Sequence, residues 1–137
     1  MKAEDTNSTN EKHQLYHRAI LLVEKDLDKE YFNEHKGHFW GIPKTCPFMR
    51  AKEGLAIFHD EYSDKAETKE HYEQLLELNP NDNQGIRYHL LRLYLEVEIY
   101  DLAERLLRQY KNDASTNFAF NEVLLHYFQD GFTAKKY

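Results

Sequence analysis

The sequence predicts an all-α protein of about six helices, paired as antiparallel helical hairpins. Apolar residues recur three and four positions apart from about Glu11 to Gln129, which is the spacing of amphipathic helices. Gly and Pro number only 5 and 3 of 137 residues, too few for a fold with many tight turns. The breaks between periodic stretches, such as Asn79-Pro80, are short, and short breaks favour helices that return alongside one another.

The composition indicates one domain with its own core and argues against several classes of partner. Hydrophobic residues make up 41% and charged residues 31% of the chain. The net charge of −6 disfavours nucleic acid and anionic membranes, which attract clustered Lys and Arg. The longest aliphatic run, 19–23, is too short to cross a bilayer, and residues 1–12 lack the apolar segment of a signal peptide. We therefore expect a cytoplasmic protein that binds neither nucleic acid nor membrane.

The N-terminal third should contain a tail, a helix and an ordered loop. Residues 1–10 are polar and predict a disordered tail. Residues 11–35 predict an N-terminal helix, whose main part ends near Leu27 and has a short continuation. The helical pattern stops over 36–48, which has two Gly and two Pro and yet is rich in large apolar side chains. We expect this loop to fold against the core and close its end with these side chains: Phe39, Trp40, Ile42 and Phe48.

Five further helices are predicted, over 49–62, 65–78, 84–97, 100–110 and 117–129. The pair Asn79-Pro80 ends the second of them, and Asn81 or Asp82 can cap the next. Ser115 or Thr116 can cap the last helix, and Gly131 should end it. These boundaries divide the chain into hairpins of similar length.

The hairpins repeat with the period of a known helical family. Leu55, Leu90 and Leu124 recur at spacings of 35 and 34 residues, and the small residue Thr68 aligns with Ala103 on the second helices. With Pro80 at the end of the first hairpin, this pattern resembles tetratricopeptide repeats, which have a period of about 34 residues. The resemblance implies a right-handed α-α superhelix and a single domain over 11–137. Its parts would be repeat one at 49–82, repeat two at 83–116 and an incomplete third repeat at 117–137.

A narrower resemblance rests on three segments: FWGIPKTCPFMRAKEGLA at 39–56, HYEQLLELNPNDNQGIRYHLL at 71–91, and NDASTNFAFNEVLLHYFQDG at 112–131. Together they are similar to bacterial tetratricopeptide proteins described as similar to suppressor of tumorigenicity seven. This chain departs from them at 44–47, where it has Lys-Thr-Cys-Pro and those proteins usually have Glu-Thr-Arg-Pro. The resemblance implies a fold and no particular activity.

In tetratricopeptide arrays the first helix of each hairpin lines a concave groove that binds peptides. The resemblance therefore predicts a partner-binding groove here. The groove would carry more acidic than basic side chains, with two arginines and a tyrosine as an aromatic anchor, and would suit a protein or peptide of basic character. Its residues would be Arg50, Glu53, Ile57, Tyr88, Arg92, Glu96, Glu122 and His126. We expect a non-catalytic adaptor that binds an extended or helical segment.

The last predicted helix has apolar residues around most of its circumference. A terminal repeat normally carries a polar outer face. This helix would therefore either belong to a longer array or pack against a second copy of the chain. The residues predicted to mediate self-association are Phe118, Phe120, Leu124, Leu125 and Phe128. A structural homodimer module is thus one alternative function.

A metal-binding protein or hydrolase is the other alternative. His13 and His17 stand four apart on a predicted helix and could share a metal, and His35 and His38 follow along the chain. The single cysteine, Cys46, could be a nucleophile, but no family signature surrounds it. No phosphate-binding loop or nucleophile elbow occurs. Because histidines on a helix face are usually solvated or packed, we expect no metal, no cofactor and no catalysis.

The register of the repeats can be tested at Ala103. Replacing it with Leu should overpack the crossing of two helices and destabilise the protein by about 1–3 kcal/mol. Thermal unfolding of the purified variant measures this effect. An unchanged melting temperature would mean that Ala103 does not lie at a helix crossing.

Overall fold

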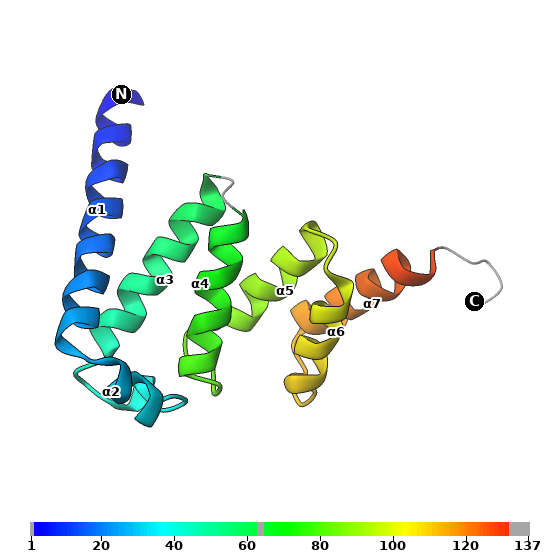
Figure 1. Cartoon of the computed structure of the whole chain (residues 1–137). Coiled ribbons are helices and arrows are strands. Elements are labelled where there is room, and N and C mark those ends of the chain that lie inside the picture. The colour runs from blue at the N-terminus through cyan, green and yellow to red at the C-terminus, as the bar shows by residue number, and fades with distance from the viewer. Residues whose placement is uncertain (1, 63–64, 132–137) are drawn as a thin grey trace. The chain divides into compact units, whose positions relative to one another are not determined.

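The computed structural model describes residues 2–62 and 65–131, and this part of the chain is all-α, as predicted (Figure 1). Its elements, in order, are α1 Lys2–Asp26, α2 Lys29–Glu34, the 3₁₀ helix η1 Phe39–Gly41, α3 Cys46–Glu61, α4 Lys65–Leu78, α5 Ile86–Glu96, α6 Tyr100–Gln109 and α7 Thr116–Asp130. The chain divides into two compact units, unit 1 at Met1–Ile86 and unit 2 at Arg87–Tyr137. Each unit is described by itself below.

The first helix is longer than predicted at one end and is interrupted at the other. α1 runs back to Lys2, where the sequence predicts a disordered tail over 1–10. That segment contains no Gly or Pro. Each residue added to an existing helix gains one backbone hydrogen bond, so extending the helix costs little free energy. α1 ends at Asp26, and the carboxylate of Asp28 accepts a hydrogen bond of 2.8 Å from the backbone N–H of Tyr31. This N-cap makes α2 a separate helix, so there are seven α-helices in the described residues where about six were predicted.

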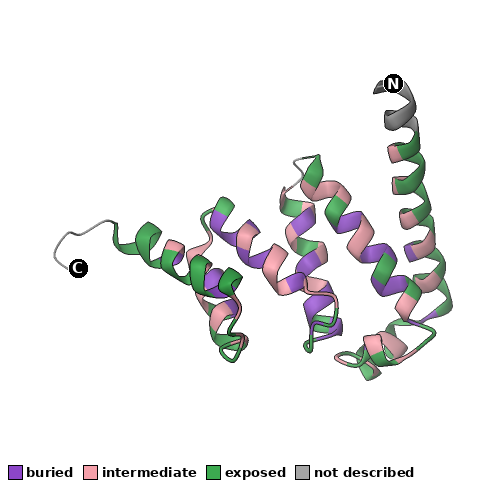
Figure 2. Cartoon of the chain, turned by 180° about the vertical axis from the view of Figure 1, so that it is seen from behind, coloured by how far each residue is buried: buried purple, intermediate pink, exposed green. Residues whose placement is uncertain are grey.

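In unit 1, α1 and α4 both pack against α3 (Figures 1 and 2). The α3–α4 hairpin buries Leu55, Tyr72 and Leu75 almost completely. Ile20 and Leu27 of α1 are buried as well, whereas Leu15 and Leu22 are each 62% exposed. Leu15 and Leu22 belong to the apolar pattern that predicts this helix. Because they stand seven positions apart, they share one side of α1, and that side is the outer one.

The loop over 36–48 folds against the core through aromatic side chains and backbone hydrogen bonds. Phe39 and Phe48 are buried, and the ring of Phe32 lies 5.0 and 5.4 Å from theirs, measured between ring centroids. The buried hydroxyl of Thr45 donates to the carbonyls of Phe39 and Ile42. Trp40, expected to close the core with them, is only half-buried.

Side-chain caps set the beginnings of α5 and α7. The carboxylate of Asp82 accepts a hydrogen bond of 2.7 Å from the N–H of Ile86, so α5 begins at Ile86, two residues later than predicted. Ser115 caps α7 as expected, accepting from the N–H of Phe118 at 3.3 Å. Gly131 follows α7 with a φ of +70°, a left-handed conformation that glycine adopts without strain. Within unit 2, α6 packs against α7 around buried residues that include Ala103 and Leu125.

The contact between α1 and α3 depends on the missing side chain of Gly54. A Cβ atom at this position would lie 2.5–2.8 Å from the ring of Tyr16. In an open helix, Gly→Ala stabilises by about 1 kcal/mol. Here Gly54→Ala should instead destabilise unit 1, because overpacking costs about 1–3 kcal/mol. Urea unfolding of the purified chain gives the free energy of unfolding.

A double-mutant cycle isolates the cause of this effect. In a Tyr16→Ala background, Gly54→Ala should become neutral or stabilising, because the ring that it meets has been removed. Gly41→Ala is the matched control, since a Cβ there meets nothing within 4 Å. Equal effects of Gly54→Ala in the presence and absence of the Tyr16 ring would contradict the proposed contact.

Candidate functional site

The predicted groove residues of unit 1 lie along α3 and differ in availability. Arg50 and Ile57 are exposed, and Ile57 presents 44% of its surface. Glu53 is half-buried and accepts a hydrogen bond of 2.6 Å from the side-chain amide of Gln84, which also donates to the carbonyl of Met49. Glu53 therefore has an internal role, which was not expected of a groove residue.

The groove residues of unit 2 fall into two groups. On α5, Arg92 pairs with Glu96 one helical turn away at 3.1 Å. Tyr88, predicted as an aromatic anchor, uses its hydroxyl to donate to Asp113 at 2.7 Å, and its ring packs edge-on against Phe118. Tyr88 thus belongs to the internal structure of unit 2. On α7, Glu122 and His126 are exposed and line a cavity together.

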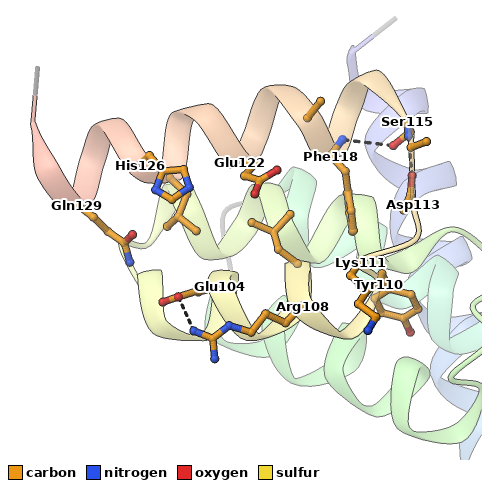
Figure 3. Close-up of a pocket in the computed structure, with 14 residues that line it drawn as sticks. Glu104, Arg108, Tyr110, Lys111, Asp113, Ser115, Phe118, Glu122, His126 and Gln129 are labelled. Carbon is orange, nitrogen blue, oxygen red and sulfur yellow. Dashed lines mark hydrogen bonds and ion pairs between the residues drawn. The ribbon is translucent and has the colours of Figure 1, made fainter. Parts of the chain in front are cut away.

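That cavity lies between α6 and α7 and has a volume of about 340 Å³ (Figure 3). Its apolar lining includes the buried residues Phe118 and Leu125, and charged side chains surround it. Glu104 and Arg108 form an ion pair on the α6 side, and Glu122 and His126 come from α7 (Figure 3). Both His126 and Glu122 were predicted as groove residues, but the α6 side of the cavity was not predicted.

The opposite face of α7 carries a stripe of exposed apolar side chains. Most of α7 is exposed (Figure 2). Phe120, Val123 and Tyr127 are 62%, 63% and 51% exposed, and their spacing of three and four residues places them on one side of the helix. Phe128 borders them and stacks on Tyr100 at 5.8 Å between centroids. We call Phe120, Val123, Tyr127 and Phe128 the α7 stripe.

The prediction for self-association is therefore corrected in part. Phe118 and Leu125 are buried in unit 2, 4% and 2% exposed, because they stand on the side of α7 that packs against the rest of the unit. They cannot form an outer contact. Phe120 and Phe128 are exposed and Leu124 is half-buried, whereas Val123 and Tyr127 were not among the predicted contacts. The full run of apolar residues was visible in the sequence, but which side is buried depends on the position of α6.

Asp113, just before α7, receives hydrogen bonds from three residues of unit 2. Its side chain is 9% exposed and accepts from Arg87 Nε at 2.7 Å, the Tyr88 hydroxyl at 2.7 Å and the Ser115 N–H at 2.8 Å. The hydrogen bonds from Ser115, Arg87 and Tyr88 hold the pKa of the Asp113 carboxyl far below its usual range, although burial opposes this. These bonds join the first turn of α5 to the loop before α7.

Unit 1 contains a cluster of imidazoles between α1, α3 and α4. His59 Nε2 on α3 lies 3.2 Å from a carboxylate oxygen of Glu67 on α4, and His71 Nε2, one turn along α4, lies 3.7 Å from the same oxygen. The His59 and His71 rings stack 5.7 Å apart at 15°. The ring of His13 on α1 lies 5.5 Å from that of His59, and burial and the neighbouring His59 and His17 lower the pKa of His13. Among the described residues, His59, Glu67 and His71 form the group whose ligand atoms converge within 4.8 Å.

Of the four histidines considered as metal ligands from the sequence, only some lie at this cluster. His13 joins the cluster, and His17, whose ring lies 5.6 Å from that of His13, stays exposed at its edge. His35 instead packs on Tyr31 at 4.2 Å, and no group of described ligand atoms combines it or His38 with His13. The alternative that used His13/His17 and His35/His38 together is therefore not assembled as one ligand group among the described residues. Glu67 and His71 share an (i, i+4) spacing that was visible in the sequence, but their proximity to His59 requires the hairpin.

Lys52 on α3 completes the surroundings of the cluster. Its side chain is buried, and its Nζ lies 3.1 Å from His71 Nδ1. Burial lowers the pKa of Lys52, while Glu24 and Glu70 counteract this. Lys52 also lines a cavity of about 250 Å³ with Phe48 and Glu77. Cys46 is away from this group, and its thiol donates to the carbonyl of Trp40 at 3.2 Å.

The chain matches no family model, no curated protein and no solved structure at a significant level. In the described part of the chain, every helix is too short or too polar to cross a membrane.

The role of Asp113 gives a prediction with a defined dependence on pH. Asp113→Asn should destabilise the chain at pH 7 by about 1–2 kcal/mol, because it weakens several hydrogen bonds to a charged acceptor. The folded pKa of Asp113 lies below its unfolded value of about 3.9, so the carboxylate stabilises the fold fully above that value. As the pH falls below about 4, this contribution is lost and the difference from the wild type should shrink.

Urea unfolding of both proteins between pH 7 and pH 3 measures this dependence. Asp26→Asn is the control, because Asp26 is an exposed carboxylate at the end of α1. A difference between the Asp113 variant and the wild type that stays constant with pH would contradict the assigned role.

Proposed function

We propose that the protein is a non-catalytic protein-interaction module built of tetratricopeptide-like hairpins. Thr68 and Ala103, aligned as the small residues of successive second helices, are both fully buried. Leu55 and Leu90, aligned on the first helices, are buried to the same degree. Equal burial at positions about 35 residues apart supports equivalent hairpins, and such hairpins generally serve to present a binding surface.

The observation that carries this proposal is the α7 stripe. Large apolar side chains gathered on one side of a helix are typical of surfaces that bind another protein. Their spacing matches the anchors of a helix that packs against a second amphipathic helix. Burying Phe120 and Tyr127 in a contact would remove well over 100 Å² of exposed apolar surface, worth a few kcal/mol at about 25 cal/mol per Å².

The chemistry of the partner follows from the residues around the stripe and from the net charge. Asp130, three residues after Tyr127, is exposed on α7, and the chain has a net charge of −6. A partner helix with an apolar face and flanking Lys or Arg would complement this surface and associate faster at low ionic strength. A second copy of the chain would bring the same negative charge to the contact. A basic protein segment is therefore the occupant that charge favours, and a homodimer is the second candidate.

A binding experiment with two matched double variants tests the proposal. Phe120→Ser/Tyr127→Ser removes two members of the stripe, and Leu15→Ser/Leu22→Ser removes two exposed apolar side chains with the same spacing from α1. Proteins captured from host lysate by the full-length wild type would be identified, purified and titrated calorimetrically against all three proteins. The stripe variant should bind its partner at least about tenfold more weakly, because aromatic anchors each contribute more than about 1 kcal/mol.

The control variant should bind like the wild type. Equal affinity of the stripe variant and the wild type would refute the role of α7. Sedimentation equilibrium of the three proteins, without a partner, tests the second candidate. Dimerisation of the wild type and the control, but not of the stripe variant, would replace the basic partner with a second copy.

A further inference from the structure

The imidazole cluster of unit 1 has the composition and the dimensions of a metal site. Two imidazole nitrogens and a carboxylate oxygen are ligands that suit zinc and its neighbours in the first transition series. They come from two helices of one hairpin, His59 from the last turns of α3 and Glu67 and His71 from successive turns of α4. The (i, i+4) spacing of Glu67 and His71 places both side chains on the same side of α4.

Two of the three separations between ligand atoms in the cluster are close to those of a tetrahedral metal centre. With Zn–N and Zn–O bonds of about 2.0–2.2 Å, two ligand atoms of a tetrahedron lie about 3.3–3.6 Å apart. The corresponding separations here are 3.2 Å between His59 Nε2 and Glu67 Oε1 and 3.7 Å between His71 Nε2 and the same oxygen. All three ligand atoms lie within 4.8 Å of one another, so small side-chain rotations would bring them around one ion.

The surroundings of the cluster are also those of a metal site. The side chains of His59 and His71 are only 12% and 14% exposed, whereas Glu67 is 41% exposed and leaves a path from solvent. His13 Nε2, beside His59, is buried and has no hydrogen-bond partner among the described residues, so a third imidazole lies close enough to supply a fourth ligand. On the other side of the His71 ring, Lys52 contacts Nδ1 at 3.1 Å and orients the ring so that Nε2 points to Glu67.

We propose that His59, Glu67 and His71 bind one zinc ion, which joins α3 to α4. The ion would be structural, because it would fix the hairpin that forms the centre of unit 1. The inference is independent of the proposed function, since the α7 stripe belongs to unit 2 and shares no residue with the cluster. The rival explanation is a carboxylate that interacts with two histidines and has no affinity for metal.

Metal titration of the untagged full-length chain distinguishes these explanations. The protein is first stripped with a chelator, and Zn²⁺ is then added in a calorimeter. One ion should bind per chain, and the melting temperature should rise with zinc concentration, because a ligand of the folded state stabilises it. Co²⁺ in place of Zn²⁺ should give the visible absorption bands of a four-coordinate cobalt ion.

Four single variants locate the site. Glu67→Gln keeps the size of the side chain and removes its charge. Glu67→Gln and His71→Gln should each weaken zinc binding by more than about 10-fold, because even the loss of a residue that only contacts a zinc ligand weakens binding by about 10–100-fold. Glu77→Gln on the same helix and His126→Gln on α7 are the matched controls and should bind like the wild type. Far-UV circular dichroism without metal shows whether each variant keeps its helices.

Two results would overturn the proposal. One is the absence of stoichiometric zinc binding by the stripped wild type at micromolar to millimolar concentrations. The other is binding that survives unchanged in both Glu67→Gln and His71→Gln. If His71→Gln fails to fold without metal, Glu67→Gln alone decides, because its neutral amide preserves the shape of the site and removes the anionic ligand.

Discussion

The close approach of α1 to α3 at Gly54 is the contact on which unit 1 depends. Because Gly54 has no side chain, the ring of Tyr16 lies directly against the backbone of α3. α3 is then covered by α1 on one side and by α4 on another, and its residues Met49 and Ala56 become fully buried. A helical hairpin alone cannot bury both of its faces, so a third helix is needed to complete the core. The cost is an outer side of α1 on which Leu15 and Leu22 remain exposed.

Unit 2 also has a helix with one buried side and one exposed side, but the exposed side carries different residues. There α7 is the outer helix, and its inner side buries Phe118 and Leu125. Its outer side differs from that of α1 because Phe120 and Tyr127 are aromatic and the exposed Val123 lies between them on the same side. The exposed large apolar residues of α1, Leu15, Leu21 and Leu22, are all aliphatic. Exposed aliphatic residues are ordinary on protein surfaces, whereas aromatic residues are enriched in contacts with other proteins. This difference is why α7 carries the functional proposal and α1 supplies the control.

The sequence predicts the helices well and the sites poorly, and the reason is physical. Helix positions follow from local periodicity and caps, so the all-α class and the cap at Ser115 could be predicted. Burial depends on which helix lies opposite, and so Phe118 and Phe120, two positions apart on α7, could not be told apart as inner and outer residues. Tyr88 fits the pattern of an exposed anchor, yet a distant carboxylate, Asp113, holds its hydroxyl. The imidazole cluster was only partly visible for the same reason, since His13 and His59 lie 46 positions apart in the chain and meet through the packing of α1 on α3.

The polar clusters around Asp113 and around Glu67 differ in how their groups interact, and this difference favours a structural role for the first and a ligand for the second. Around Asp113 three donors meet one carboxylate, the charges of Arg87 and Asp113 cancel, and each distance is that of a direct hydrogen bond. Such a group is complete by itself. Around Glu67 two imidazoles face one carboxylate oxygen at 3.2 and 3.7 Å, near the edge length of a metal tetrahedron, and a third imidazole lies beside them. The Asp113 group already pairs each of its donors with an acceptor, whereas the group around Glu67 turns two imidazole nitrogens and a carboxylate oxygen toward one point. A metal ion at that point would bind all three ligand atoms at once, which a single hydrogen bond between two of them cannot do.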